Sequence, residues 1–241
     1  MTARPLVVAH RALTPRAVEN TRSAIGIATA SGADLIELDI RLTLDRQPVV
    51  FHDAFLHRST RARGWVRLWP SFLLNRIPLR DSSNADRVLS VKAVLREFPD
   101  GVQPALHLKD RAALGSVLQS IRRHGQPDRT WLWLENPRDV HAATRRLPGL
   151  RVTLLRPAGW TPANRQRYFE EAQWVGATGI SVPWGVVDEG LLRHAHSHHL
   201  LVFSRLERMG DVGRLAGLGL DGIITDDPRA VVEGLAALPP T

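Results

Sequence analysis

The stretch that decides the fold is DLIELDIRLTLDRQPVVFHD, at residues 34–53. Its first half alternates as a buried strand does, because side chains two residues apart point to the same face. One face therefore carries Leu35, Glu37, Asp39 and Arg41. Like charges side by side on a mostly apolar strand repel each other and resist burial. A compensating positive charge is expected beside this acidic pair.

Short apolar runs typical of strands recur along the chain, and each is followed by a stretch with helical periodicity. The predicted strands are residues 5–10, 34–41, 103–109, 130–135, 151–156, 178–183, 199–204 and 221–226. A helix is predicted over 19–32, and PVVFHD (48–53) is interpreted as an extension of the second strand. Strand–helix alternation favours a parallel sheet, and eight such units favour a closed (β/α)8 barrel, the TIM-barrel architecture.

Residues 54–90 interrupt this alternation. The segment is rich in Arg, Trp and Pro and has no clean period, so it is predicted to be an irregular insertion or lid. We expect one domain over 1–241 with this insertion after the second strand. Its apolar side chains either pack on the barrel rim or make transient contact with lipid or a membrane surface through 65–74; these are Trp65, Trp69, Phe72, Leu73 and Leu74.

The basic charge of the chain bears on which partners it could bind. The formal net charge is +8, from 32 basic and 24 acidic residues, and nearly all the basic residues are arginines. Arginine suits planar phosphate recognition, although such a bias is also an ordinary result of genome composition. The arginines are spread along the whole chain, so no nucleic-acid partner is expected.

Other classes are disfavoured by what the sequence lacks. It contains no cysteine, which excludes disulfides and thiolate metal sites. The first residues, MTARPLVVAHR, lack the apolar region of a secretion signal, and no apolar run approaches the ~20 residues of a membrane span. We expect a cytoplasmic protein, and no obligate protein partner is evident.

Ionisable residues gather where the predicted strands end, which is where barrels of this type place their catalytic groups. They are His10, Arg11, Glu37, Asp39, His52, Asp53, His107, Lys109, Glu135 and Asp226. A divalent cation between the carboxylates of the acidic pair would turn repulsion into coordination, because hard cations take carboxylate oxygens. The alternative is a structural pair neutralised by Arg11 or Arg41.

The stretch VVAHRALTPRAVENTRSAIGIATASGADLIELDIRLTLDRQPVVFHDAFLHRST resembles the opening of the glycerophosphodiester phosphodiesterase family. The matching pieces are AHR, ENT, the helix leading to GAD, IELDIRLTLD, and VVFHD followed by LHRST. A weaker similarity continues to LGLDGIITDDP at 217–228. The resemblance implies a metal-dependent barrel enzyme that cleaves a small phosphodiester, most simply a glycerophosphodiester, to glycerol 3-phosphate and an alcohol.

By this resemblance, His10 and His52 form the general acid–base pair. Arg11 binds the phosphate with Glu19 in support, and Lys109 neutralises charge that develops on phosphorus. Two imidazoles suit proton transfer near neutral pH, and phosphodiester cleavage also needs fixed positive charge near the non-bridging oxygens.

The metal site departs from the family pattern. Glu37 and Asp39 match two metal ligands, but the third, usually a Glu on the third strand, is His107 here. An imidazole ligand favours Mn, Zn or Fe over the Mg or Ca that carboxylates favour. Alternatively, Glu135 supplies the third carboxylate, or the site no longer binds metal well. Phe203 stands where the family usually has Trp, and it is expected to form an aromatic wall against the substrate.

These departures leave three hypotheses of function. The first is hydrolysis of glycerophosphodiesters. The second is a phosphodiesterase acting on lysophospholipids or another phosphodiester, with the apolar segment 65–74 as a contact. The third is a barrel that binds phosphodiesters without turnover.

Overall fold

Eight parallel strands close into a barrel in this computed structural model, which describes residues 4–13, 15, 17–82, 86–155 and 164–238. The barrel strands are β1 (Leu6–Ala9), β2 (Leu35–Leu42), β5 (Gln103–Leu108), β6 (Trp131–Leu134), β7 (Arg151–Leu155), β8 (Gly179–Val182), β9 (Leu201–Arg205) and β10 (Gly222–Thr225). Strand β1 pairs with β2 on one side and β10 on the other, which closes the ring. The predicted (β/α)8 barrel is confirmed.

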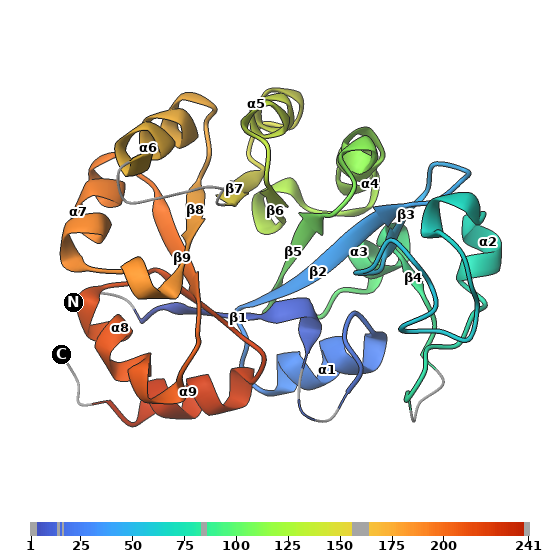
Figure 1. The fold of residues 1–241 in the computed structure, drawn as a ribbon, viewed down its shortest axis with the longest axis horizontal. Helices are drawn as coiled ribbons and strands as arrows, with labels where there is room; N and C mark the ends of the chain where they lie inside the picture. Colours follow the sequence, from blue (N-terminus) through green and yellow to red (C-terminus); the bar gives the residue numbers. More distant parts are fainter. Residues whose placement is uncertain (1–3, 14, 16, 83–85, 156–163, 239–241) are drawn as a thin grey trace.

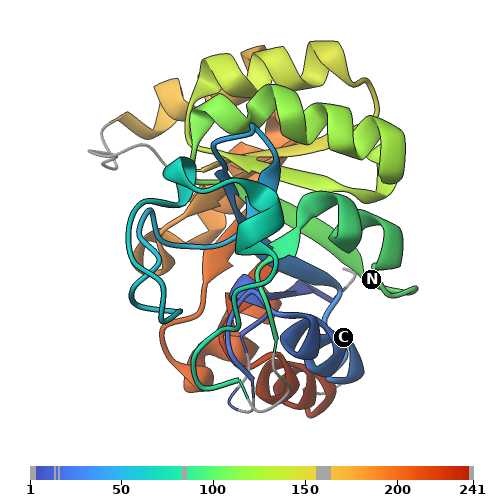
Figure 2. The ribbon, with the colours of Figure 1, turned by 90° about the vertical axis from the view of Figure 1, so that its right-hand side faces the viewer.

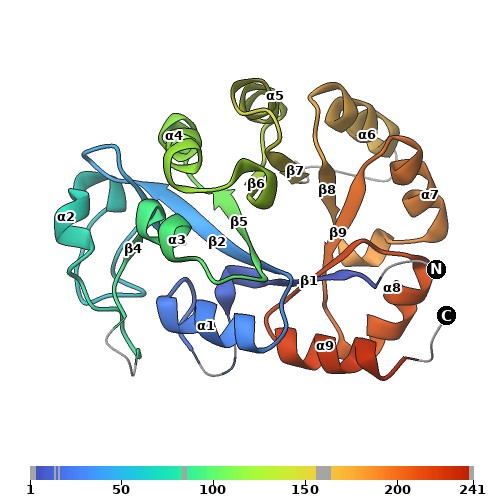
Figure 3. The same cartoon turned by 180° about the vertical axis from the view of Figure 1, so that it is seen from behind.

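A helix follows each barrel strand, and these helices form a ring around the strands (Figure 1; Figure 3 from behind). They are α1 (Arg22–Ala30), α3 (Val91–Glu97), α4 (Leu114–His124), α5 (Pro137–Arg146), α6 (Arg165–Trp174), α7 (Glu189–Ser197), α8 (Val212–Leu218) and α9 (Pro228–Ala236). Short 3-10 turns lie at η1 (His10–Ala12), η2 (Val66–Leu68), η3 (Arg111–Ala113), η4 (Pro127–Arg129), η6 (Trp184–Val186) and η7 (Met209–Asp211).

Helix α1 begins later than its sequence pattern predicts. Thr21 is its N-cap, and the Thr21 hydroxyl accepts a hydrogen bond from the backbone N–H of Ala24 at 3.0 Å. A threonine cap of this kind satisfies a backbone donor that the first turn leaves unpaired. Glu19 and Asn20 therefore precede the helix, in a turn where Asn20 has a left-handed φ of 60°.

PVVFHD does not extend β2 along its own direction, as the sequence analysis assumed. It contains β3 (Pro48–Val50), which pairs antiparallel with β2, and β4 (Leu89–Ser90) pairs antiparallel with β3. The intervening turn lets the chain fold back, because Thr43 bonds across it to the carbonyl of Gln47. The hairpin extends the sheet beyond the barrel and carries His52 back towards the strand ends.

The alternation of β2 separates two apolar cores. Ile36, Leu38 and Ile40 face outward and are fully buried under the helices. The barrel interior has its own cluster, made of Val8, Leu35, Ala105, Trp131, Trp133, Phe203 and Ile224. The acidic pair of β2 shares the inward face with Leu35, so it stands above this interior cluster.

Phe203 belongs to that interior cluster, which is at odds with the substrate contact expected of it. The ring is fully buried and meets Trp131 edge-on, with 5.4 Å between ring centroids. The inward position at the end of β9 falls two residues later, at Arg205. An aromatic wall at the mouth of the barrel is therefore not formed by Phe203.

The insertion lies beside the barrel at the end of β2 and faces the viewer in Figure 2. It contains only short elements, such as α2 (Ser71–Leu74), and isolated antiparallel bridges. It has a small apolar cluster of its own, composed of Val49, Phe51, Leu56, Val66, Leu74, Leu79 and Val88. No helix among the described residues is long and apolar enough to cross a membrane.

Gly222 leaves the space that the Phe203 ring fills. A Cβ atom at residue 222 would lie 2.3 Å from Cδ1 of Phe203. Overpacking of a core costs about 1–3 kcal/mol, so Gly222→Ala should lower the free energy of unfolding by about that amount in chemical denaturation. Adding Phe203→Leu should recover part of the loss. Gly217→Ala is the control, because nothing lies within 4 Å of a Cβ at that helical position.

An unfolding midpoint of Gly222→Ala equal to that of the wild type, with Gly217→Ala also unchanged, would contradict this packing of the barrel interior.

Candidate active site

Two buried carboxylates form the centre of the site, and each is held by a residue that lies between β1 and α1. The backbone N–H of Arg11 donates to Glu37 Oε2 at 2.6 Å. Asn20 makes a paired contact with Asp39: its Nδ2 donates to Asp39 Oδ2, and its Oδ1 accepts from the Asp39 N–H, both at 3.0 Å. The chain after β1 is therefore shaped around the acidic pair.

The turn after β1 reaches Glu37 through two left-handed residues. Arg11 has φ 56° and Ala12 has φ 54°. A glycine adopts this region freely, whereas an alanine there is disfavoured by about 1–2 kcal/mol. The strained turn is held in place by the hydrogen bond from the Arg11 N–H to Glu37.

Positive groups from the end of β5 face the same carboxylates. His107 Nδ1 lies 3.1 Å from Glu37 Oε1 and 3.6 Å from Asp39 Oδ1. Lys109 Nζ lies 3.3 Å from Asp39 Oδ1. Strands β2 and β5 are neighbours with Asp39 opposite His107, so the contact follows from the strand register.

The two carboxylates respond differently to this environment. Burial opposes the charge of Glu37, but the hydrogen bond and charge of His107, with His10 and the Arg11 N–H, outweigh it and lower the Glu37 pKa. Burial and the neighbouring Glu37 charge raise the pKa of Asp39, in spite of Lys109. Burial alone would lower the pKa of His107, but Glu135 and Glu37 raise it. Without a metal ion, His107 and Lys109 are therefore the basic groups that face the acidic pair.

The residues present fit a divalent cation. Glu37, Asp39 and His107 each offer a donor atom, and these atoms all lie within 4.8 Å of one another. Among the described residues, the buried Asp39 Oδ1 accepts no hydrogen bond and has only ion-pair contacts, with Lys109 at 3.3 Å and His107 at 3.6 Å, so it has room for a further ligand. Glu135 does not belong to this group. Its carboxylate is largely exposed and lies 3.6 Å from His107 Nε2, on the far side of the ring.

Both candidate acid–base histidines have a carboxylate partner on the same ring nitrogen. His10 Nδ1 lies 2.8 Å from Asp226 Oδ1, and His52 Nδ1 lies 2.6 Å from Asp53 Oδ1. A carboxylate on Nδ1 selects the tautomer that carries its proton there. The lone pair of the neutral ring is then on Nε2, which is the atom left for chemistry.

Arginines link these carboxylates into a network. Arg58 bonds to both Asp53 and Glu19, and Glu19 in turn accepts from Arg11 Nη1 at 3.1 Å. Burial raises the pKa of Glu19, but the hydrogen bonds from the two arginines lower it more. Arg11 Nε also lies 3.5 Å from Asp39 Oδ2. The expected support of Arg11 by Glu19 therefore has a structural basis.

Sequence reasoning assigned no role to four residues of this network. Asn20 follows Glu19 in the ENT motif, and its left-handed turn directs it to Asp39. Asp226 was recognised only as a polar strand end. Arg205 donates to Asp226 Oδ2 at 2.6 Å, and the period of two on β9 would have found it. Arg58 lies in the LHRST piece of the resemblance, but its link to Glu19, 39 residues earlier in the chain, depends on the fold.

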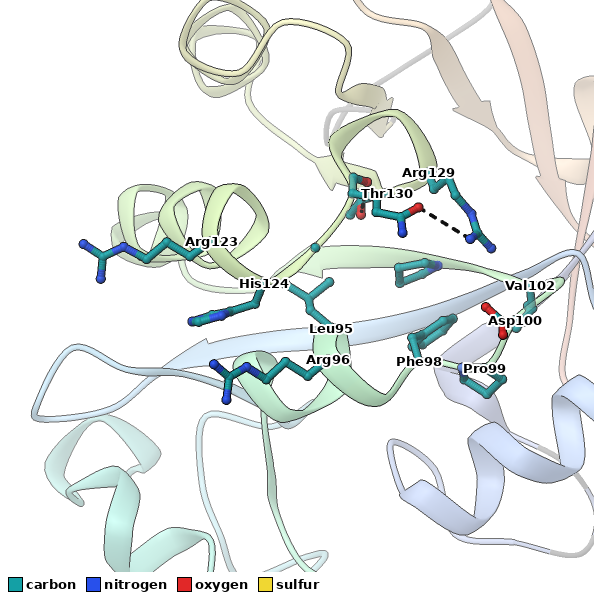
Figure 4. Close-up of a pocket in the computed structure, with 13 residues that line it drawn as sticks. Leu95, Arg96, Phe98, Pro99, Asp100, Val102, Arg123, His124, Arg129 and Thr130 are labelled. Atoms are coloured by element: carbon teal, nitrogen blue, oxygen red, sulfur yellow. Dashed lines mark hydrogen bonds between the residues drawn. The ribbon is translucent and has the colours of Figure 1, made fainter.

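Two hollows lie at opposite ends of the barrel. A pocket of about 230 Å³ adjoins the site, where Lys109 and Arg41 face Trp65 and Arg67 of the insertion. A hollow of about 410 Å³ lies where the chain enters β5 and β6, and includes Phe98, Val102 and Arg129 among its lining residues (Figure 4). Only the first is at the carboxyl ends of the strands, where the ionisable residues gather.

In metal-free protein near neutral pH, neutralising Glu37 and neutralising Asp39 should have opposite effects on the stability of the fold. The pKa of Asp39 is raised, so its charge opposes folding, and Asp39→Asn should keep or raise the unfolding temperature in chelator. The pKa of Glu37 is lowered, so its charge favours folding above the ordinary carboxyl pKa and less as the pH falls. Glu37→Gln should therefore destabilise by about 1–3 kcal/mol.

An added divalent cation should raise the unfolding temperature of the wild type and of neither variant. A wild-type unfolding temperature that ignores both chelator and added metal at every concentration would contradict the metal site.

The chain is similar to known proteins over most of its length. Residues 10–230 match the glycerophosphoryl diester phosphodiesterase family. A glycerophosphodiester phosphodiesterase of Caldanaerobacter subterraneus is 26% identical over 246 residues, which cover 95% of this chain and 96% of that protein.

Solved structures share the fold. A phosphodiesterase of Oleispira antarctica, in complex with the product sn-glycerol-3-phosphate, has a TM-score of 0.83 and 20% identity, covering 97% of this chain and 98% of that one. A glycerophosphodiester phosphodiesterase of Agrobacterium tumefaciens has a TM-score of 0.82 and 20% identity, covering 95% and 99%. Because the family match runs through nearly all the barrel, this chain belongs to the glycerophosphoryl diester phosphodiesterase family.

Proposed function

We propose that this protein hydrolyses glycerophosphodiesters to glycerol 3-phosphate and an alcohol, in a reaction that depends on a divalent metal. The observation that carries the proposal is the arrangement at the carboxyl ends of the strands. There, the candidate metal ligands Glu37, Asp39 and His107 lie close to Lys109. The same end of the barrel carries His10 and His52, each paired through Nδ1 with a carboxylate. Family membership supports the reaction class, and the relative from Oleispira antarctica is solved with glycerol 3-phosphate as its product.

We assign the metal to Glu37, Asp39 and His107, in preference to Glu135. When bound, the cation would withdraw negative charge from the non-bridging oxygens of the phosphate. His107 would offer Nδ1, the nitrogen nearer the two carboxylates, and Glu135 would hold the opposite nitrogen. A second carboxylate of this kind commonly orients a ligating imidazole. The mixed donor set favours Mn, Zn or Fe over Mg or Ca.

Arg11 and Lys109 would position the phosphate. Arg11 is held by Glu19 and lies beside Asp39, and Lys109 lies on the other side of the same carboxylate. Fixed cations that need no rearrangement stabilise the charge that grows on the phosphate oxygens in the transition state.

His10 and His52 would move the protons. One ring, neutral at Nε2, takes the proton of the attacking hydroxyl, which comes from water or from the substrate itself. The other ring, protonated, gives its Nε2 proton to the departing alcohol as the phosphorus–oxygen bond breaks. Asp226 and Asp53 stabilise the positive charge on each imidazole in turn, because both accept from Nδ1.

A lysophospholipid substrate is a second candidate, and one observation favours it. The pocket beside Lys109 opens towards Trp65, whose side chain is exposed. An acyl chain would find apolar surface there that a small headgroup does not need. The assignments of 1–241 as one domain, with 54–90 as a lid, and of a cytoplasmic location stay predictions.

His10→Ala and His52→Ala should each reduce the turnover number by about 10²–10⁴-fold, the usual contribution of a general acid or base. The measurement is release of glycerol 3-phosphate from a panel of glycerophosphodiesters with metal supplied. Metal affinity and unfolding temperature should stay near those of the wild type. His124→Ala is the matched control, because His124 lies at the opposite end of the barrel.

Turnover near the wild-type value in either variant, on a substrate with a poorly leaving alcohol, would reject the assignment. Substrate binding with no product from the wild type under any metal would favour the non-catalytic barrel.

His107→Glu should shift metal preference towards Mg or Ca, because it replaces the softer donor with a carboxylate. His107→Ala should reduce metal affinity most, whereas Glu135→Gln should reduce it by only about 10–100-fold, as loss of an orienting partner does. Calorimetric titration with each metal reports this directly and needs no turnover. The opposite order, with Glu135→Gln abolishing binding and His107→Ala tolerated, would make Glu135 the ligand.

A further inference from the structure

The insertion has an outer apolar surface as well as an inner one. Nine large apolar side chains are exposed in the described part of the chain, and six of them lie in or against the insertion. Its inner side is already satisfied, because Val66 and Leu74 are buried in the local cluster. Phe72 remains 59% exposed and Leu68 60%. Such a concentration marks an interaction surface rather than scattered exposure.

A neighbouring loop adds to this surface. The N–H of Leu44 donates to the carbonyl of Trp69 at 3.0 Å, and Asp45 accepts from the N–H of Ser71 at 2.9 Å. Leu44 is 60% exposed. We define the rim patch as Leu44, Leu68, Phe72 and Leu73.

The rim patch stands in a strongly basic segment. Residues 54–80 contain no Asp or Glu and the following six arginines: Arg58, Arg61, Arg63, Arg67, Arg76 and Arg80. Of these, only Arg58 forms a salt bridge in the described structure. The other five are exposed and have no described carboxylate partner. Arg80 donates to the carbonyl of Thr60, which leaves four without a described hydrogen-bond partner, namely Arg61, Arg63, Arg67 and Arg76. Arg67 lies over the Trp65 ring, 5.1 Å from its centroid.

The charge and the apolar surface together select the partner. A second copy of this chain would set one acid-free basic segment against another, which like charges oppose. A nucleic acid would satisfy the arginines but would leave Leu68 and Phe72 against phosphate and water. A bilayer with anionic headgroups offers both an apolar boundary and negative charge, and each basic residue near such a surface contributes about fivefold in affinity.

We propose that the rim patch docks on an anionic lipid surface. Leu68 and Phe72 enter the headgroup layer, and the four arginines without a described hydrogen-bond partner contact lipid phosphates. Trp65 and Arg67, which neighbour Leu68 in the chain, line the same pocket as Lys109, so the rim patch adjoins the mouth of the site. Docking therefore turns the mouth of the barrel towards the membrane, independently of which phosphodiester is cleaved.

Vesicle co-sedimentation tests this with the full chain. The protein should bind vesicles of equal phosphatidylcholine and phosphatidylglycerol, bind phosphatidylcholine alone far less, and dissociate as salt is added. Leu68→Ser with Phe72→Ser should weaken binding by about tenfold or more, because two exposed apolar side chains no longer enter the layer. Arg61→Gln with Arg63→Gln should weaken it by about 25-fold.

The matched controls are surfaces that have either exposed apolar side chains or a run of arginines, but not both. Trp174 is 77% exposed on α6, so Trp174→Ser removes an exposed aromatic elsewhere. Residues 140–169 also contain six arginines and no acid, but their described part has no exposed large apolar side chain. Arg145→Gln with Arg146→Gln therefore removes charge alone. Both controls should bind vesicles within about twofold of the wild type, and unfolding temperatures check that every variant folds.

Three outcomes would overturn the proposal: no binding to the anionic vesicles, equal losses in control and rim-patch variants, or full binding by Leu68→Ser with Phe72→Ser. Tighter binding to single-stranded RNA than to the vesicles would assign the arginines to nucleic acid. The vesicle assay does not depend on turnover. A variant that loses activity but still binds vesicles would therefore have a defect in the active site and not in the rim patch.

Discussion

Two like charges on successive inward positions of one strand constrain the rest of this structure. Ionised carboxylates resist burial and repel each other, so neighbouring segments must supply donors and positive charge. The Arg11 N–H, the Asn20 amide and the His107 imidazole do so. These groups come from two segments, the turn after β1 and the end of β5, which meet here because β1 and β5 are the two barrel neighbours of β2. The buried acidic pair of β2 therefore explains both the chemistry of the site and the path of the chain after β1.

The inner side of the insertion supports the site, and its outer side is exposed to solvent. Its inner side packs on β3 and holds Arg58, which joins Asp53 to Glu19 and so ties His52 to the residue that supports Arg11. Its outer side exposes apolar and basic residues beyond what folding requires. One segment therefore both supports the site and carries the exposed apolar and basic surface.

The sequence predicted the positions of the strands closely, because alternation and β-branched runs are local signals. It predicted correctly that Leu35, Glu37 and Asp39 share one face of β2, and the structure shows that this face points into the barrel. It misjudged the start of α1, where a threonine cap outweighs helical periodicity. It also misjudged PVVFHD, because a hairpin and a continued strand have the same composition when the turn between them is short.

By itself, the sequence determined which residue types stand at the strand ends, since a period of two and the barrel rule require only local order. The tertiary structure alone decided their partners. Phe203 is fully buried in the barrel interior because Gly222, which has no Cβ, leaves space for its ring. Asp226 reaches His10 because closing the ring pairs β10 with β1, and Glu135 lies behind His107 because β5 and β6 are neighbouring strands. These contacts depend on how the strands pack against one another, which cannot be read from any single segment of the sequence.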